Sequence, residues 1–350
     1  MNRTPRRSLL AAAAALCLGL TLAGGPPGAS ALVRSRAAST VIDPATLPRG
    51  ADTDLLHSRG HRIVDGDRVV RTDLSGQLAM IGRAVRGYVV VTRDQSDGSA
   101  TVWRVRRDGT ARKLRELTDR AGILRVSSRG DRLAWAVPGN DRTRVLVART
   151  ADGSLVGSVR RAGFLEVADV GRHRVLVSGL QPTRTLWFHP TTGSTERLFG
   201  QQVWEADIAV DRAVVTVEDE AGPDGLCLSY RRLRDPSTRF WRSCTDKPLA
   251  FSPDRSLMVT TDIQSDGIGP STLEVRDATH NTPLASYTPD GGYFGSPEWE
   301  DADSFVVRVW ADGHAAQVRI TTAGLVERVS RVATVDADNF RALWWTFPNG

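Results

Sequence analysis

The chain has almost no lysine, and its positive charge is not concentrated in one place. Of its 46 basic residues only Lys113 and Lys247 are lysines, and the arginines are scattered among 40 acidic residues. The formal net charge of +6 falls to +3 when the three arginines of the first seven residues are left out. Because nucleic-acid-binding proteins gather positive charge on one face, we expect no nucleic acid partner.

Motifs for catalysis and for cofactor binding are also missing. The sequence has no Gly-x-Ser-x-Gly elbow, no Cys-x-x-Cys pair and no glycine loop followed by lysine. His57 and His61 have the spacing of a helical metal site, but Gly60 between them argues against a helix. We therefore predict no catalytic residue, no metal site and no cofactor, and we favour a protein that is not an enzyme.

Long apolar runs are absent except near the N-terminus. Residues 1–31 begin with an arginine pair, continue with an apolar stretch at 9–23 and end in Ala-Ser-Ala. This pattern predicts a secretory signal peptide, cleaved before Leu32. The arginine pair also resembles a twin-arginine signal, so the Sec and twin-arginine routes both stay open. No later segment has about 18 consecutive apolar residues, so we expect a secreted or cell-envelope protein without a membrane span.

The rest of the chain consists of short valine-rich runs with regularly spaced turns. Turn residues of similar type stand between two such runs at seven positions, 40 to 44 residues apart, namely 65–66, 108–109, 152–153, 192–193, 235–236, 279–280 and 323–324. This period matches the four strands of a propeller blade. The sequence thus predicts an all-β fold, a seven-bladed β-propeller of four-stranded antiparallel blades, with six blades and a spare hairpin as the alternative.

The two ends of the repeat region indicate how the ring closes. One expected strand, at 61–64, precedes the first turn, so the first blade lacks two strands. Two further strands are expected at 333–338 and 340–346, with no hairpin after them. We expect these N- and C-terminal strands to complete one blade, because an open ring would leave unpaired strand edges. The expected segments are the signal peptide at 1–31, a flexible lead-in at 32–56 and one propeller domain at 57–350.

Residues 102–109 (VWRVRRDG) and 186–193 (LWFHPTTG) each place a tryptophan in a strand before a tight turn. Residues 251–257 (FSPDRSL) hold a Ser-Pro-Asp turn in which Arg255 follows the aspartate. These runs resemble the third strand and the Ser-Pro-Asp-Gly turn of TolB-like and WD-repeat-like bacterial propellers, with Arg255 in place of the glycine. The resemblance implies a propeller fold and a habit of binding proteins.

Three of the nine tryptophans have predictable places in such a ring. Trp103 and Trp187 stand at equivalent strand positions, which indicates packing between neighbouring blades. Trp299 lies among acidic residues in the first strand of its repeat, which places it near the central channel.

Two cysteines, Cys227 and Cys244, follow the predicted signal peptide, whereas Cys17 lies within it. Their midpoint falls in the turn at 235–236, so the two side chains come out opposite each other in an antiparallel hairpin. An exported chain can keep such a pair oxidised, and we predict a structural disulfide between them.

Acidic residues recur between the second and third strands of several repeats. The loops at 94–98 and 262–267, the run at 218–220 and Asp141 share this slot. We expect one face of the ring to be acidic. Calcium in these loops is an open alternative, since clustered carboxylates suit it, although none of the loops matches the Asp-x-Asp-x-Asp-Gly pattern.

Two functions are compatible with these features. The first is an exported, non-catalytic propeller that serves as a scaffold for binding a protein or a cell-envelope ligand on one ring face. The second is an extracellular propeller enzyme, a glycan hydrolase or lyase, with paired carboxylates at the channel mouth. The sequence specifies no oligomeric state. The carboxylates placed at or near first-strand ends are Glu205, Asp207, Glu298, Glu300 and Asp301.

Overall fold

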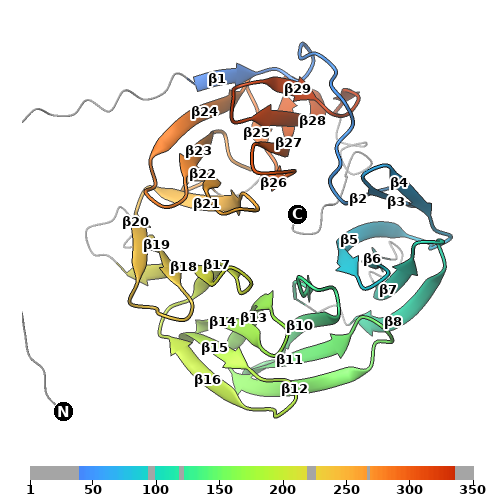
Figure 1. Ribbon diagram of the computed structural model, residues 1–350, viewed down its shortest axis with the longest axis vertical. Helices are drawn as coiled ribbons and strands as arrows, with labels where there is room; N and C mark the ends of the chain where they lie inside the picture. The colour runs from blue at the N-terminus through green and yellow to red at the C-terminus, as the bar shows by residue number, and fades with distance from the viewer. Residues whose placement is uncertain (1–38, 94–98, 118–121, 219–225, 266–268, 336–350) are drawn as a thin grey trace, which may run out of the picture. The chain divides into compact units, whose positions relative to one another are not determined.

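The computed structural model describes residues 39–93, 99–117, 122–218, 226–265 and 269–335. The secondary-structure elements of these residues are all β-strands. Among the same residues there is no helix of the length and apolar character needed to cross a membrane. The strands form seven small sheets around a common centre, and Figure 1 shows them as the blades of a ring. The predicted seven-bladed β-propeller is therefore confirmed.

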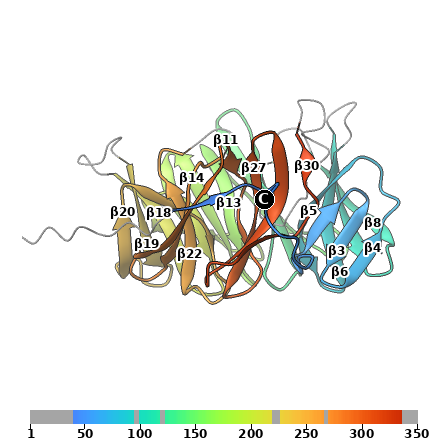
Figure 2. The same ribbon diagram turned by 90° about the horizontal axis from the view of Figure 1, so that it is seen from above.

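Within each blade the strands follow one another outwards from the centre, and they run across the thickness of the ring (Figure 2). Blades 1 to 4 comprise β2 (His57–Arg59), β3 (Arg62–Asp65) and β4 (Arg68–Arg71); β5 (Gln77–Ala84), β6 (Gly87–Arg93), β7 (Ala100–Arg106) and β8 (Ala111–Leu117); β9 (Arg125–Val126), β10 (Arg132–Pro138), β11 (Arg142–Arg149) and β12 (Leu155–Ala162); and β13 (Phe164–Val170), β14 (Val175–Gln181), β15 (Thr183–Phe188) and β16 (Thr195–Phe199). Blades 5 to 7 comprise β17 (Val203–Asp207), β18 (Arg212–Glu218), β19 (Leu226–Arg232) and β20 (Arg239–Ser243); β21 (Asp246–Phe251), β22 (Leu257–Asp262), β23 (Leu273–Asp277) and β24 (Pro283–Pro289), with β1 (Ser39–Ile42) added at the outer edge; and β25 (Tyr293–Phe294), β26 (Glu298–Trp299), β27 (Ser304–Ala311), β28 (His314–Thr321), β29 (Val326–Arg328) and β30 (Ala333–Thr334).

The predicted turns join the third strand to the fourth in blades 2 to 6, β3 to β4 in blade 1 and β28 to β29 in blade 7. The turns between the first and second strands of the blades hold one residue at a positive φ angle, the conformation that favours glycine over the arginine found at position 255. At this slot Gly130, Asp211 and Arg255 have φ angles of 70°, 62° and 61°. Glycine adopts this left-handed region freely, whereas a residue with a Cβ atom is strained there. Arg86, Asp211 and Arg255 thus hold a position that glycine adopts at lower cost.

Burial explains the character of the apolar runs. The second strand of a blade is covered by the neighbouring blades on both sides, so β6 is buried from its first residue to its sixth. Such strands read as continuous valine-rich runs. The fourth strand lies at the rim, and β8 is exposed or half-buried along its whole length.

Each gap between neighbouring blades holds an apolar cluster, and six of these clusters are large. Trp187 belongs to the cluster between blades 4 and 5, and Trp103 packs on the cluster between blades 1 and 2. Both tryptophans therefore pack between blades, as predicted. In the described residues the gap between blades 7 and 1 has only a small cluster, made of Val306, Val329 and Leu55.

An ion-pair network reinforces this weak gap. The Arg319 guanidinium of blade 7 binds the carboxylates of Glu300 and Glu327, and its side chain is only 16% exposed. It also donates to the Asp52 carbonyl at 3.2 Å, while Glu300 accepts from the Thr53 hydroxyl. The segment that leads into blade 1 is thereby tied to blade 7.

The N-terminal segment differs from the loose lead-in that we expected over 32–56. Residues 39–42 form β1, which pairs in parallel with β24 of blade 6. Further along, Arg49 forms a parallel bridge to Arg328 of blade 7. The segment runs past blades 6 and 7 before blade 1, because backbone groups at the rim accept an added strand.

The ends of the ring also differ in detail from the expected closure. Blade 1 has two strands before its turn, since β2 precedes β3, so among the described residues it lacks one strand and not two. The start of the expected strand at 333–338 forms β30, which pairs with β28 of blade 7 and not with blade 1. The expected strand at 340–346 lies outside the described residues, so its part in the closure stays a prediction.

The disulfide between Cys227 and Cys244 is present. Leu228 of β19 lies opposite Ser243 of β20, which sets the two cysteines opposite each other as the midpoint of their positions predicted. Cys227 is fully buried.

Candidate functional site

The described residues form a central channel with a volume of about 1010 Å³. The first strands of the blades surround the centre of the ring in Figure 1, and their side chains and turns line this channel. Because the fold gathers one strand from every repeat here, residues that are about 40 apart in the sequence meet around a single space.

The charges that line the channel are unbalanced. Among the described residues six arginines and four carboxylates line it, namely Arg83, Arg125, Arg129, Arg172, Arg234 and Arg255, and Asp169, Glu205, Asp207 and Glu298. Arg129, Arg172 and Arg255 all belong to turns between first and second strands. We call the side of the ring that carries these turns the turn face. The arginines therefore gather where the channel opens on the turn face.

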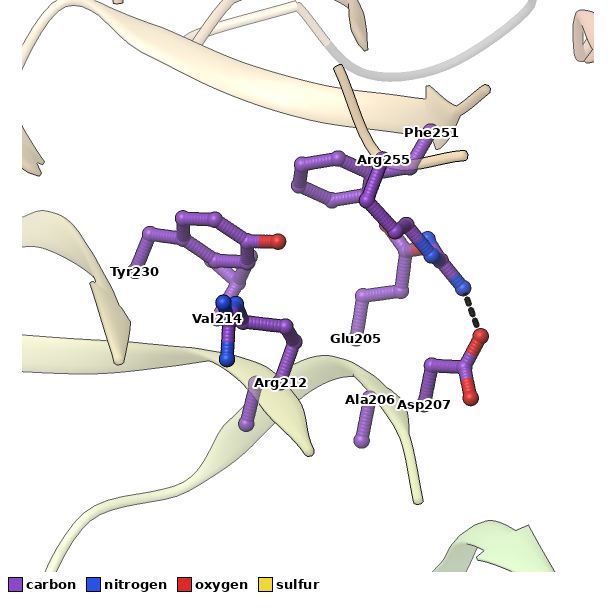
Figure 3. Close-up of a pocket in the computed structure, with 9 residues that line it drawn as sticks. Glu205, Ala206, Asp207, Arg212, Val214, Tyr230, Phe251 and Arg255 are labelled. Atoms are coloured by element: carbon purple, nitrogen blue, oxygen red, sulfur yellow. Dashed lines mark hydrogen bonds and ion pairs between the residues drawn. The ribbon is translucent and has the colours of Figure 1, made fainter. Parts of the chain in front are cut away.

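Arg255 holds two of the candidate carboxylates. Its guanidinium forms an ion pair with Asp207, and its Nη1 lies 3.8 Å from Oε1 of Glu205 (Figure 3). The Arg255 side chain is 19% exposed, and it lies over the ring of Phe251 at 5.2 Å. The strained backbone of Arg255 thus places one cation between two first-strand carboxylates.

Glu205 has a strongly perturbed acidity. Burial raises the pKa of its carboxyl from 4.5 to about 7, although the Arg255 and Arg125 guanidiniums oppose this shift. The neighbouring carboxylates Asp207 and Glu298 raise the same pKa further. Glu205 therefore changes charge near neutral pH.

Asp169 shows the same direction of shift from a different surrounding. Burial raises the pKa of this carboxyl, although two backbone N–H groups donate to it. These donors are the amides of Ile208 and Val170, each at 2.6 Å. Asp169 is thus occupied in holding the inner ends of blades 4 and 5 together.

A small cavity of about 10 Å³ lies beneath the Arg255 pair. Figure 3 shows the Tyr230 ring, Arg212 and Glu205 around it. Burial raises the pKa of the Tyr230 phenol to about 12, although Arg255 and Arg212 lie near enough to oppose the shift. The cavity has room for about one water molecule and not for a substrate.

The channel has one exposed tryptophan, Trp204, which sequence reasoning did not single out. Its residue surface is 47% exposed, and it lines the channel next to Glu205. The Lys247 ammonium lies 5.5 Å from the centre of its ring. Trp299 also lines the channel, as its first-strand position predicted, but it is only 7% exposed and packs on Phe305.

The five candidate carboxylates separate into two groups. Glu205, Asp207 and Glu298 line the channel, as expected. Glu300 instead binds Arg319, and Asp301 accepts from the Asp303 amide and the Ser304 hydroxyl in the turn that follows β26. The position near a first-strand end therefore did not predict a place in the channel for Glu300 and Asp301, because the turn after β26 directs their side chains to structural partners.

The remaining candidates for metal binding do not come together. His57 is buried in β2 with its Nδ1 2.8 Å from the Leu55 carbonyl, whereas His61 is exposed. The residues that the structure describes include no group of three or more His, Cys, Asp or Glu that could hold a metal ion. The acidic loop at 94–98 lies outside the described residues, as do parts of those at 218–220 and 262–267, so calcium binding there stays an untested alternative.

Comparison with known proteins gives the fold and no more. No protein-family model matches the chain, and no curated protein matches its sequence. Similar solved structures include an uncharacterised protein from Listeria monocytogenes, with 11% identity over 75% of this chain and 85% of that one and a TM-score of 0.49. TolB from Acinetobacter baumannii has 12% identity over 74% and 67% of the two chains, with a TM-score of 0.46. The β-propeller domain of the Trilobed protease from Pyrococcus furiosus has 12% identity over 73% and 84%, with a TM-score of 0.48.

Proposed function

We propose that this chain is an exported, non-catalytic β-propeller that binds a protein or a cell-envelope ligand at its central channel. The observation that carries the proposal is the lining of the channel. It is wide, it presents an exposed Trp204, and its arginines outnumber its carboxylates. Concave sites with an aromatic side chain and a few polar groups are typical of ligand binding.

The state of the carboxylates favours binding over catalysis. The Asp207 carboxylate forms an ion pair with Arg255, and the Asp169 carboxyl accepts hydrogen bonds from two backbone amides. Acid–base hydrolysis of a glycan needs two carboxyl groups free to act on the bond between them. Binding makes no such demand.

The test is retention of envelope material on the immobilised mature protein, residues 32–350. Detergent-solubilised envelope and culture supernatant of the source organism would be passed over wild type and over Trp204→Ala. The control is Leu284→Ala, because Leu284 is similarly exposed, at 52%, but lies on the rim strand β24. We expect saturable retention that Trp204→Ala loses and Leu284→Ala keeps. Equal retention by all three proteins, or none, would contradict the proposal.

Export is part of the same proposal, and the disulfide supports it. A disulfide persists in oxidising compartments outside the cytoplasm. N-terminal sequencing of the protein recovered from envelope or medium is expected to begin at Leu32. Recovery of the uncleaved chain from the cytoplasm alone would contradict export.

One observation favours a second candidate function, the extracellular glycan hydrolase or lyase. A carboxyl group that keeps its proton up to a pKa of about 7 can act as a general acid, and Glu205 has this property. If the protein is such an enzyme, glycan cleavage by wild type disappears in Glu205→Gln and falls above pH 7. The binding proposal predicts no cleavage by either protein.

A further inference from the structure

The arginines at the turn-face end of the channel differ in what they contact. Arg255 is committed to Asp207 and Glu205, and Arg83 to Asp65. Arg129 and Arg172 are exposed, and no hydrogen bond or ion pair joins their side chains to any residue in the described part of the chain. Two guanidiniums are therefore open to a ligand at the mouth of the channel.

The two open arginines lie on neighbouring blades. Arg129 stands in the turn between β9 and β10 of blade 3, and Arg172 in the turn between β13 and β14 of blade 4. Arg234 of blade 5 continues this arc, and its side chain is 78% exposed with a weak contact of 3.9 Å to Asp211. A planar guanidinium presents paired donors that match a carboxylate or a phosphate. The arc is thus suited to more than one negative group.

Trp204 lies deeper in the same channel. It precedes Asp207 by three residues on β17, and β17 has a bulge between Val203 and Glu205, so Trp204 stands roughly 8 Å from the level of Asp207. A single small ion cannot contact both Trp204 and the arginine arc. The occupant that matches both features is a chain with flat apolar faces and negative groups along it. Sugar rings pack their C–H faces on exposed tryptophan, and acidic sugars carry a carboxylate on each ring.

We propose that the ligand of the channel is an acidic oligosaccharide, with its carboxylates on Arg129 and Arg172 and a sugar ring against Trp204. This inference rests on the proposed binding function and names the class of its ligand. An acidic peptide shares the charge but lacks the repeated rings, and the experiment separates the two.

The channel carboxylates add a pH dependence of known sign. Glu205 is faced by Arg255 from the turn between β21 and β22, by Arg125 of β9, by Glu298 of β26 and by Asp207 of its own strand. Arg212 of β18 and the Tyr230 phenol of β19 lie beside it at the small cavity. When Glu205 takes up a proton, the channel loses one negative charge. Binding of an acidic chain therefore strengthens as the pH falls through about 7, the pKa of Glu205.

The experiment is a calorimetric titration of the mature protein with hexagalacturonate. The probes for comparison are its fully methyl-esterified form, which keeps the rings and removes the charge, and hexaglutamate, which keeps the charge and removes the rings. The variants are Arg129→Ala/Arg172→Ala and Trp204→Ala, with Arg160→Ala as a control because Arg160 is an exposed arginine of the rim strand β12.

We expect hexagalacturonate to bind wild type and Arg160→Ala alike. The double arginine variant and Trp204→Ala should each bind about tenfold more weakly, as expected for losing partly exposed contacts. Binding by wild type should be about threefold tighter at about pH 6 than at about pH 8, and Glu205→Gln should remove this difference.

Three results would overturn the inference: no binding of hexagalacturonate, equal binding by the arginine variant, or equal or tighter binding of the methyl ester or of hexaglutamate. If any of these occurs while envelope retention still depends on Trp204, the binding function stands and only the ligand class is wrong. If retention fails as well, both proposals fall.

Discussion

Replacing Glu205 by glutamine should change how stability depends on pH. The folded protein holds the Glu205 proton up to about pH 7, whereas the unfolded chain releases it near 4.5. Between these values the folded state binds more protons, so the contribution of Glu205 to stability is complete at low pH and is lost as the pH rises through 7. Glutamine has the same shape and no charge, so the variant lacks this loss.

The size of the effect follows from the shift. A change from 4.5 to about 7 corresponds to at most about 3 kcal/mol. The Glu205 side chain is 30% exposed to the channel, and solvent screening reduces the expected value to about 1.5 kcal/mol. Buried His57, whose pKa is lowered mainly by burial, makes the stability of both proteins rise with pH in an overlapping range. Only the difference between wild type and variant isolates Glu205, because the other groups cancel.

The assay is urea unfolding of wild type and Glu205→Gln at about pH 5 and about pH 8. We expect the variant to gain about 1.5 kcal/mol relative to wild type between the two pH values. Glu116→Gln is the control. Because the Glu116 side chain is 72% exposed, we expect this substitution to change the free energy of unfolding by the same amount at both pH values. If the difference between wild type and Glu205→Gln is the same at both pH values, the account of the channel carboxylates is refuted.

Three further predictions concern stability and are checked by the same unfolding assay. Arg319→Gln should lower the free energy of unfolding by about 3 kcal/mol, because it leaves two nearly buried carboxylates unpaired. The control Lys113→Gln, at an exposed ion pair, should change it by less than about 0.5 kcal/mol. Equal effects of the two substitutions would show that the network does not hold blades 7 and 1 together. Replacing Cys227 and Cys244 by alanine should cost about 3 kcal/mol for a bridge across 17 residues, and an unchanged unfolding midpoint would contradict this. Arg255→Gly should be more stable than Arg255→Ala by about 1 kcal/mol, since both lose the ion pair and only glycine relieves the left-handed backbone; alanine equal to glycine would mean that the backbone is not strained.

The ring of seven blades could be predicted from the sequence, but the way in which the ring closes between blades 7 and 1 could not. Turn chemistry and valine-rich runs recur locally in every repeat, so the seven blades and the strand order could be predicted from them. The closure depends on contacts between distant segments, such as Arg319 with the carbonyl of Asp52. No local pattern marks residues 39–42 as a strand, because their partner β24 lies more than 240 residues away.

The candidate site was predicted in part for a similar reason. The repeat placed Glu205, Asp207 and Glu298 at the channel, since first strands always face the centre. It could not show that Arg255 would engage two of them, because that depends on a side chain from the next blade. Trp204 lies in a first strand, and Arg129 and Arg172 lie in turns between first and second strands. The repeat pattern identifies these positions in every blade, so an alignment of the repeats could have placed the three residues at the channel.

Hydrogen exchange of the mature protein with and without the retained envelope fraction tests the central claim, that the ligand occupies the channel. We expect the fraction to slow exchange in β17, at Val203–Asp207, and in the turns at 127–131 and 171–174, which carry Arg129 and Arg172. The rim strand β12, Leu155–Ala162, should exchange at the same rate with and without it. Slowed exchange confined to the rim, or no change in the channel segments at saturation, would contradict the account.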